Sequence, residues 1–336
     1  MEKFTDLERE TTYIASGFSN LQLAQDIASY VGTDLGPIEQ RIHPNGQIYS
    51  RFMESVRGKN VFIVQPHVGN LAHSVNDSIM QQCLLADAAR SSSAKEITAV
   101  SPYIAYTRQD RKSRGREPIG TRVVIDQLAG SGVGRIVSVD MHSPQTQAIF
   151  RGPFDHLTAQ PILREAMIEE LNGYDRQECV VVAPDAGAAK LAGRHSRELG
   201  MSVLHMVKMR DPHDSQKIHR EEKVPEADGR VCLVFDDMID TAGTLVSAAE
   251  ALKNSGAKNI FVAATHGILS GPAIERLKDA PIDRVLVTDT FGMETAQAEL
   301  DGKLRVVSTA PIIGQAIMEI VRDGSVSRIF AEQNYM

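Results

Sequence analysis

Short apolar runs of four or five residues recur along the chain, and segments with helical periodicity separate them. This pattern is typical of a parallel α/β sheet, in which buried strands alternate with amphipathic helices. We expect strands over residues 13–16, 61–65, 97–101, 136–140, 180–183, 203–207, 231–235, 260–264, 285–288 and 304–308. We expect helices over residues 76–94, 118–130, 161–171, 186–199, 244–255 and 311–323.

The strand–helix rhythm of residues 61–140 is repeated over residues 180–235. Strands 61–65, 97–101 and 136–140 correspond in this interpretation to strands 180–183, 203–207 and 231–235. We interpret the repeat as an internal duplication, which predicts two similar parallel-sheet domains spanning 1–155 and 156–336. The stretch Arg151–Phe154 is the expected linker. Packing of the last strand or helix back on the N-terminal domain is a further possibility under this interpretation.

Length and composition limit the possible classes of protein. The 336 residues suffice for two domains, and 42% of them are hydrophobic. A net charge of −7 argues against nonspecific binding of nucleic acid. The sequence shows no secretory signal and no apolar run of bilayer-spanning length. The three cysteines lack metal-ligand spacing. We therefore expect a cytoplasmic protein with neither a nucleic acid nor a membrane as its partner.

The stretch Val231–Thr244 contains the most informative motif. An apolar strand delivers Asp236 and Asp237 to its end, and a loop of small residues then opens a helix. Backbone N–H groups of such a loop close around a phosphate, while the helix N-terminus adds its positive dipole end. The carboxylates are placed to accept hydrogen bonds from vicinal sugar hydroxyls or to hold a metal. The alternative is that they only cap the strand–helix turn. The loop residues are Asp240, Thr241, Ala242, Gly243 and Thr244.

Further polar motifs follow other predicted strands. The segment Tyr106–Lys112 places arginines, which match phosphate oxygens, beside an amide that can reach a base edge. Asp185 begins a second loop of small residues. His142 ends another strand, where a lone histidine is more often structural. The stretch Thr265–Ala273 is interpreted as architectural support. The polar segment 211–229 has two interpretations of equal weight, a ligand loop or a solvated loop.

Together these motifs resemble, in order, those of the ribose-phosphate pyrophosphokinases, which have the type I phosphoribosyltransferase fold. The resemblance runs from about residue 12 to residue 330. It implies transfer of the diphosphoryl group of ATP to the C1 hydroxyl of ribose 5-phosphate, which gives phosphoribosyl pyrophosphate and AMP. It also implies Mg²⁺ as cofactor and a homo-oligomer, expected to be a hexamer, because one nucleotide loop reaches a neighbouring subunit in this family.

The resemblance also implies roles for particular residues. The loop Asp240–Thr244 would hold the 5-phosphate, and Asp236 and Asp237 the ribose hydroxyls. The expected ATP-binding residues are Arg108, Gln109, Asp110, His43, Asn45 and Gln47. The expected metal ligands are His142 and Asp185, and the expected catalytic cations are Lys208 and Arg210. The expected contacts of an allosteric phosphate are Ser55 and Arg57. For the two catalytic cations, surface salt bridging is the alternative role.

The chain departs from the family pattern at several positions. Gln47 stands where the family has glutamate, and a glutamine amide donates as well as accepts, so we hypothesise an altered adenine preference. Ala188 replaces a glycine, which an alanine tolerates unless the position needs a positive φ. Residues 211–230 differ from the usual catalytic loop. A non-catalytic regulatory or binding paralogue is therefore an alternative, and a phosphoribosyltransferase is a more distant one.

Overall fold

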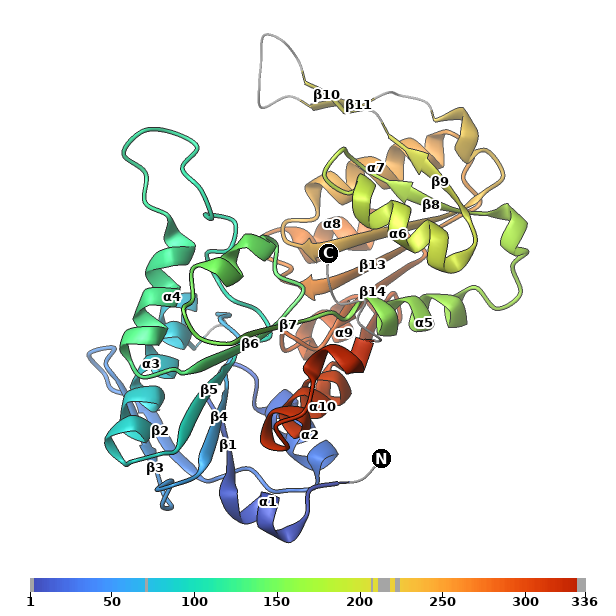
Figure 1. Ribbon diagram of the computed structural model, residues 1–336. Coiled ribbons are helices and arrows are strands. Elements are labelled where there is room, and N and C mark those ends of the chain that lie inside the picture. Colours follow the sequence, from blue (N-terminus) through green and yellow to red (C-terminus); the bar gives the residue numbers. More distant parts are fainter. Residues whose placement is uncertain (1–2, 70–71, 207, 211–217, 221–223, 331–336) are drawn as a thin grey trace. The chain divides into compact units, whose positions relative to one another are not determined.

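The computed structural model describes residues 3–69, 72–206, 208–210, 218–220 and 224–330, with the backbone alone for 208–210 and 218–220. The chain divides into two compact units, each built on its own parallel sheet (Figure 1). The first unit comprises Met1–Ala159, Thr290–Gly292 and Ser308–Met336; the second comprises Gln160–Asp289 and Met293–Val307.

The first unit contains a five-stranded sheet in the order β1-β4-β5-β6-β7, and all of its pairings are parallel. Buried apolar residues fill the strands, as expected for a sheet that is covered on both faces. Its strands are β1 (Thr12–Ser16), β4 (Asn60–Val64), β5 (Glu96–Val100), β6 (Arg135–Val139) and β7 (Phe154–Leu157). Its helices are α1 (Asp6–Thr11), α2 (Leu21–Val31), α3 (Val75–Ser91), α4 (Gly120–Gly130) and α10 (Ala310–Val321), with 3₁₀ turns η1 (Pro144–Ala148) and η4 (Val326–Phe330).

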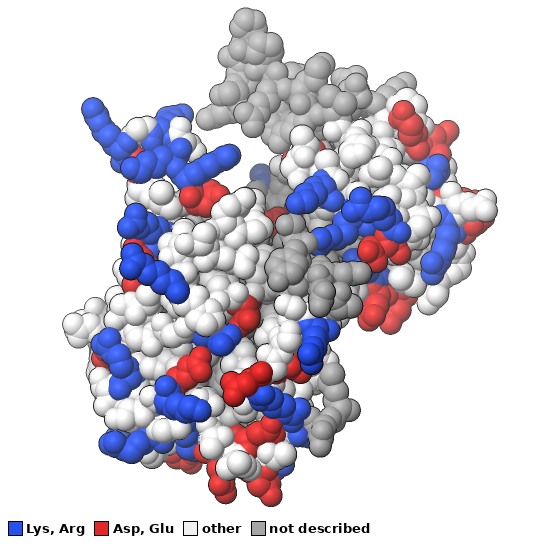
Figure 2. All heavy atoms as spheres, viewed as in Figure 1, with Lys and Arg blue, Asp and Glu red and all other residues white. Residues whose placement is uncertain are grey.

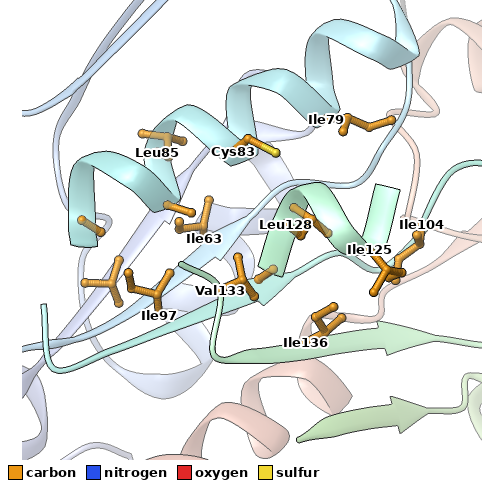
Figure 3. Close-up of a cluster of buried hydrophobic side chains, with 14 of the residues drawn as sticks. Ile63, Ile79, Cys83, Leu85, Ile97, Ile104, Ile125, Leu128, Val133 and Ile136 are labelled. Carbon is orange, nitrogen blue, oxygen red and sulfur yellow. The ribbon is translucent and has the colours of Figure 1, made fainter. Parts of the chain in front are cut away.

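The core on one side of this sheet lies beneath α3 and α4. Figure 3 shows Ile79 and Cys83 of α3 and Leu128 of α4 facing the strand residues Ile63 and Ile136. These side chains are nearly or fully buried. Helix α3 begins with a capping box, in which the Ser74 hydroxyl accepts from the N–H of Asp77 and Asp77 accepts from the Ser74 N–H.

The second unit contains a six-stranded parallel sheet in the order β15-β14-β13-β12-β8-β9. Its strands are β8 (Cys179–Ala183), β9 (Ser202–His205), β12 (Val231–Ile239), β13 (Asn259–Gly267), β14 (Arg284–Thr288) and β15 (Leu304–Val307). Its helices are α5 (Gln160–Glu170), α6 (Ala189–Leu199), α7 (Gly243–Asn254), α8 (Ala273–Asp279) and α9 (Glu294–Glu299), with 3₁₀ turns η2 (Arg176–Glu178) and η3 (Pro225–Ala227).

Two antiparallel hairpins stand apart from the sheets. Strands β2 (Ile38–Ile42) and β3 (Ile48–Phe52) form one hairpin in the first unit. Strands β10 (Lys208–Arg210) and β11 (Ile218–Arg220) form the other, in the second unit. No helix within the described ranges is long and apolar enough to cross a membrane.

The parallel α/β class is confirmed, and each predicted strand and helix overlaps an observed one. The expected linker at Arg151–Phe154 is wrong at its end, because Phe154 begins β7 and pairs with β6. The expected strand-by-strand correspondence also fails. In the first sheet β5 lies between β4 and β6, whereas in the second β8 lies between β9 and β12. Periodicity gives the order of strands along the chain, not their lateral neighbours.

Candidate functional site

The carboxylates Asp236 and Asp237 lie within the last four residues of β12, which continues past the predicted strand end to Ile239. The pairing of β12 with β8 stops at Val234, whereas the pairing with β13 continues. Among the described residues, the pairing of β12 with β8 therefore ends before the two carboxylates. Since β8 ends at Ala183, the Asp185 loop emerges at the same carboxyl edge of the sheet, which is where open α/β sheets bind ligands.

Negative charge is concentrated at this edge. Burial, the neighbouring Asp237 and the charge of Asp185 together raise the pKa of Asp236 well above its ordinary value. The N–H of Asp237 donates to Oδ1 of Asp236 at 2.8 Å, which offsets part of this effect. A site that holds carboxylates against their mutual repulsion suits a ligand rich in hydroxyl donors or a cation.

The loop after β12 leads directly into α7, which begins at Gly243, one residue earlier than predicted. Ala242 precedes it as the N-cap residue in the left-handed conformation, with φ of 59°, and makes no side-chain capping hydrogen bond. The first N–H groups of α7 are thus available to an anion. The phosphate-cradle interpretation of the loop stays a prediction.

Two residues that the sequence interpretation missed hold this loop in place. The Ser270 hydroxyl donates to the Asp240 carboxylate. Nη1 of Arg276 donates to the Thr241 carbonyl oxygen at 2.8 Å. Ser270 belongs to the stretch 265–273, interpreted from the sequence as architectural support. No sequence signal pointed to Arg276, which lies in α8.

The Asp185 loop tolerates its alanine. Ala188 has φ of −80°, so the position does not need glycine, and its N–H donates to Oδ1 of Asp185 at 3.1 Å. This bond orients the carboxylate toward the start of α6.

The two predicted metal ligands lie in different units. His142 is exposed and follows β6 in the first unit, whereas Asp185 belongs to the second. Among the described residues, no three His, Cys, Asp or Glu side chains form a metal-binding group. The metal assignment stays a prediction.

The predicted ATP loop leaves the first sheet after β5. Arg108 and Gln109 are exposed and Asp110 is half-buried. Figure 2 shows Lys and Arg side chains gathered at the upper left of the view, where Figure 1 draws this loop. Its base is rigid, because the Thr121 hydroxyl donates to the Tyr106 carbonyl at 2.6 Å and the Gln109 N–H donates to the same oxygen at 2.8 Å. The cations are thus accessible to an anionic ligand.

The remaining predicted nucleotide residues form the tip of the β2–β3 hairpin. The His43 N–H donates to the Gln47 carbonyl at 2.7 Å, and the Gln47 N–H donates to Oδ1 of Asn45 at 3.1 Å. Gly46 makes the turn with φ of 84°. The side chain of Gln47 is exposed and that of His43 is half-buried. The hairpin therefore presents both to a ligand beyond its tip.

The two predicted allosteric residues are hydrogen-bonded to each other, and one of them also contacts Ser93. The Arg57 N–H donates to the Ser55 hydroxyl at 3.4 Å, and Nη1 of Arg57 donates to the Ser93 hydroxyl at 3.4 Å. Ser93 precedes β5, and no motif pointed to it.

The structure describes only part of the predicted catalytic loop. The backbone of Lys208 and Arg210 belongs to β10, whereas Val207 and residues 211–217 lie outside the described residues.

The two parallel units, with the Asp236–Thr244 motif at the carboxyl edge of the second sheet, define an α/β protein of the type I phosphoribosyltransferase fold. The family model for the N-terminal domain of ribose phosphate pyrophosphokinase matches residues 12–132. The model for the phosphoribosyl synthetase-associated domain matches residues 217–331.

Whole-chain relatives agree with these matches. The ribose-phosphate pyrophosphokinase of Streptomyces coelicolor is 40% identical over 318 residues, covering 95% of each chain, and that of Aquifex aeolicus is 40% identical over 317 residues, covering 94% of this chain and 98% of the relative. The crystal structure of phosphoribosylpyrophosphate synthetase from Mycobacterium smegmatis matches with a TM-score of 0.84 at 36% identity, covering 94% of this chain and all of that one. The chain belongs to the ribose-phosphate pyrophosphokinase family, and it is an enzyme.

Proposed function

We propose that the enzyme transfers the diphosphoryl group of ATP to the C1 hydroxyl of ribose 5-phosphate, giving phosphoribosyl pyrophosphate and AMP. The observation that carries the proposal is the edge of β12, where a carboxylate pair meets an uncapped helix N-terminus. The loop Asp240–Thr244 and the first turn of α7 bind the 5-phosphate. Asp236 and Asp237 accept hydrogen bonds from the ribose hydroxyls.

ATP binds to the first unit in this proposal. Arg108, Gln109 and Asp110 hold it on the loop after β5, and the hairpin tip with His43, Asn45 and Gln47 contacts the base. The C1 oxygen attacks the β-phosphorus in line, the bond from this phosphorus to the oxygen bridging to the α-phosphate breaks, and AMP leaves. Lys208 and Arg210 offset the charge that develops, so positioning and electrostatics provide most of the acceleration.

Mg²⁺ fits the donor set at the second sheet. The raised pKa of Asp236, caused by burial and by the charges of Asp237 and Asp185, marks a site where a cation would relieve repulsion, and oxygen ligands are those that Mg²⁺ prefers. Asp185 would hold such an ion at the second sheet, and His142, in the first unit, would bind the magnesium of the nucleotide directly or through water. Bound Mg²⁺ would neutralise phosphate charge and polarise the transferred group.

Two further features belong to the proposal. Ser55, Arg57 and Ser93 form a candidate site for regulatory phosphate, since a guanidinium and two hydroxyls suit an anion. The enzyme works as a homo-oligomer, with a hexamer expected, and acts in the cytoplasm. The exposed hairpin tip supports the first of these points, because it has the form needed to reach a neighbouring subunit.

The test is AMP formation from ATP, ribose 5-phosphate and Mg²⁺, with and without inorganic phosphate. We expect AMP to depend on ribose 5-phosphate and its rate to fall by about a thousandfold in Lys208→Ala. Lys258→Ala is the matched control, because Lys258 precedes β13 at the opposite end of the sheet and pairs with Glu178 on the surface. A well-folded oligomer that forms no AMP in either condition would instead be a regulatory or binding paralogue.

A further inference from the structure

The side chain of Gln81 in α3 binds both strands of the nucleotide hairpin. It is fully buried, and its Nε2 donates to Oε1 of Gln40 at 2.7 Å and to the Ser50 hydroxyl at 3.5 Å. Gln40 and Ser50 are cross-strand partners in β2 and β3. One amide therefore holds the hairpin at a paired position, three residues before His43 and three residues after Gln47.

The other end of the same amide is fixed to the edge of the first sheet. Oε1 of Gln81 accepts from the Phe18 N–H at 2.9 Å and from Nε2 of Gln65 at 3.0 Å. Because the Phe18 N–H can only donate, the Gln81 oxygen must face it, and the NH₂ group must face Gln40. All hydrogen-bonding positions of the amide are used, so its orientation is unique.

The backbone after β1 approaches this network so closely that a side chain does not fit. A Cβ added to Gly17 would lie 1.9 Å from Oε1 of Gln65 and 2.8 Å from Oε1 of Gln81. Gln65 is itself fully buried, and its Oε1 accepts from the Ser19 N–H at 3.3 Å. The chain thus places two buried glutamines beside a glycine, where they provide acceptors for the backbone N–H groups of Phe18 and Ser19.

The hairpin depends on such contacts for its direction. It is a two-stranded ribbon with no pairing to the five-stranded sheet, and a ribbon of this kind is marginal alone. Apolar contacts of Ile38 and Phe52 anchor its open end against the core. Between that anchor and the tip, Gln81 binds both strands at once. A change there would pivot the tip while leaving the base attached.

We infer that Gln81 is a positioning residue for recognition of the nucleotide base: it holds the hairpin in the orientation in which His43 and Gln47 meet the base. The inference rests on the proposed function, in which the hairpin tip contacts ATP. Removing Gln81 should therefore reduce discrimination between bases. The triphosphate contacts of Arg108 and its neighbours lie on a different loop and should persist.

The experiment compares kcat and KM for ATP and for GTP in the wild type and Gln81→Leu. We expect kcat/KM for ATP to fall about tenfold through KM, the ATP-to-GTP ratio to fall by a similar factor, and KM for ribose 5-phosphate to stay within about twofold. Gln81→Glu should restore the ratio. Its oxygens can still accept from Phe18 and Gln65, and Gln40 can turn its amide to donate to the other oxygen.

Gln160→Leu is the matched control in the second unit. Gln160 is also a buried helical glutamine, with Oε1 bonded to Nε2 of His195 at 2.8 Å and Nε2 bonded to the Thr265 hydroxyl at 3.1 Å. We expect it to lower the melting temperature as Gln81→Leu does, without changing the ATP-to-GTP ratio. Should Gln81→Leu fail to fold, Gln40→Leu removes the acceptor from the half-buried hairpin side and should lower the ratio in the same direction.

The outcomes separate the inference from the proposed function. An unchanged ratio in a folded Gln81→Leu enzyme with a lowered melting temperature would make Gln81 a stability residue only and overturn the inference. A wild type that uses ATP and GTP equally would overturn it as well, because the hairpin would then not read the base. A wild type that forms no AMP from ribose 5-phosphate would instead reject the proposed function before any variant is compared.

Discussion

The two sheets present their predicted ligand groups in different ways. In the second unit β12 and β13 are nine residues long, and β12 itself carries Asp236 and Asp237 beside the start of α7. In the first unit the strands have four or five residues, and the ligand groups lie beyond them on the Tyr106–Lys112 loop and the hairpin. The proposed sugar-phosphate site is therefore built from regular backbone, and the proposed nucleotide site from projecting segments.

This difference affects how the ligand groups of each unit are held in position. A strand end and a helix N-terminus place their ligand groups mainly by secondary structure, and in the second unit Ser270 and Arg276 hold the loop between them. A projecting loop needs other anchors. In the first unit Gln81 holds the hairpin, and the buried His67 accepts from the Ala105 N–H at 3.4 Å through Nδ1, just before the predicted ATP loop. We conclude that the interior of the first unit contributes to the geometry of its site.

The largest expected effect concerns Asp236→Asn. Burial and the charges of Asp237 and Asp185 raise the pKa of Asp236, so the native state holds its proton to higher pH than the unfolded chain does. The wild type therefore loses this contribution to stability as pH rises above the unfolded pKa, and the asparagine variant does not. We expect the variant to melt higher at pH 8 and to lose about a thousandfold in kcat/KM for ribose 5-phosphate.

Melting temperatures at pH 5 and pH 8, measured beside the kinetics, check this prediction. The stability gain of Asp236→Asn should be larger at pH 8, where the unfavourable charge is more fully developed. If the variant melts lower than the wild type at both values of pH, the charge of Asp236 does not destabilise the second unit. Charge repulsion at the end of β12 would then not distinguish the second unit from the first.

The next effect uses a feature that the two units share. Each buries a histidine against a glutamine at 2.8 Å, His67 with Gln82 and His195 with Gln160. Burial lowers the pKa of His67 to about 4 and, helped by nearby arginines, that of His195 to about 3. Because the unfolded chain takes up these protons below about pH 6.5, stability is complete above that value. It should fall by about 3 kcal/mol for each histidine toward pH 4.

Denaturant unfolding at pH 8 and pH 4.5 measures this loss. His67→Leu and His195→Leu should each be less stable than the wild type at pH 8, since a buried glutamine loses its partner. Each should also remove about half of the histidine-dependent fall at acid pH. If neither variant changes the loss of unfolding free energy between pH 8 and pH 4.5, groups other than these histidines control the acid sensitivity of both units.

Hydrophobic periodicity predicted all the parallel strands except β7, because a strand covered on both faces appears as an unbroken apolar run. It missed β2 and β3, whose residues are polar or only half-buried. Site residues were likewise predictable only where one continuous segment of sequence contains them. The contiguous motif from Asp236 to Thr244 was predictable, since one segment provides both the strand end and the helix start. The contributions of Gln81, Ser93 and Arg276 were not, because each comes from a segment distant in sequence.

A smaller effect contrasts one glycine from each unit. Gly17→Ala would place a Cβ 1.9 Å from Oε1 of Gln65, whereas Gly187→Ala would place one 3.2 Å from Oδ1 of Asp185. We expect Gly17→Ala to cost about 1–3 kcal/mol of unfolding free energy and Gly187→Ala to change it by less than about 0.5 kcal/mol. Urea unfolding of the two variants side by side measures the difference. Equal losses of unfolding free energy would show that Gln65 and Gln81 move aside for an added Cβ as easily as the Asp185 loop does.

The smallest expected effect concerns backbone strain in the predicted phosphate loop, Asp240–Thr244. Ala242 has φ of 59°, a conformation that costs a residue with a Cβ about 1–2 kcal/mol and glycine almost nothing. After the larger unfolded-state entropy of glycine is allowed for, Ala242→Gly should stabilise the second unit by about 0.5 kcal/mol. In the first unit Tyr106 has a similar φ of 64°, but its hydroxyl donates to Asn76 at 2.8 Å, so Tyr106→Gly should destabilise. Urea midpoints that moved in the same direction in both variants would show that backbone strain is not what separates the two loops.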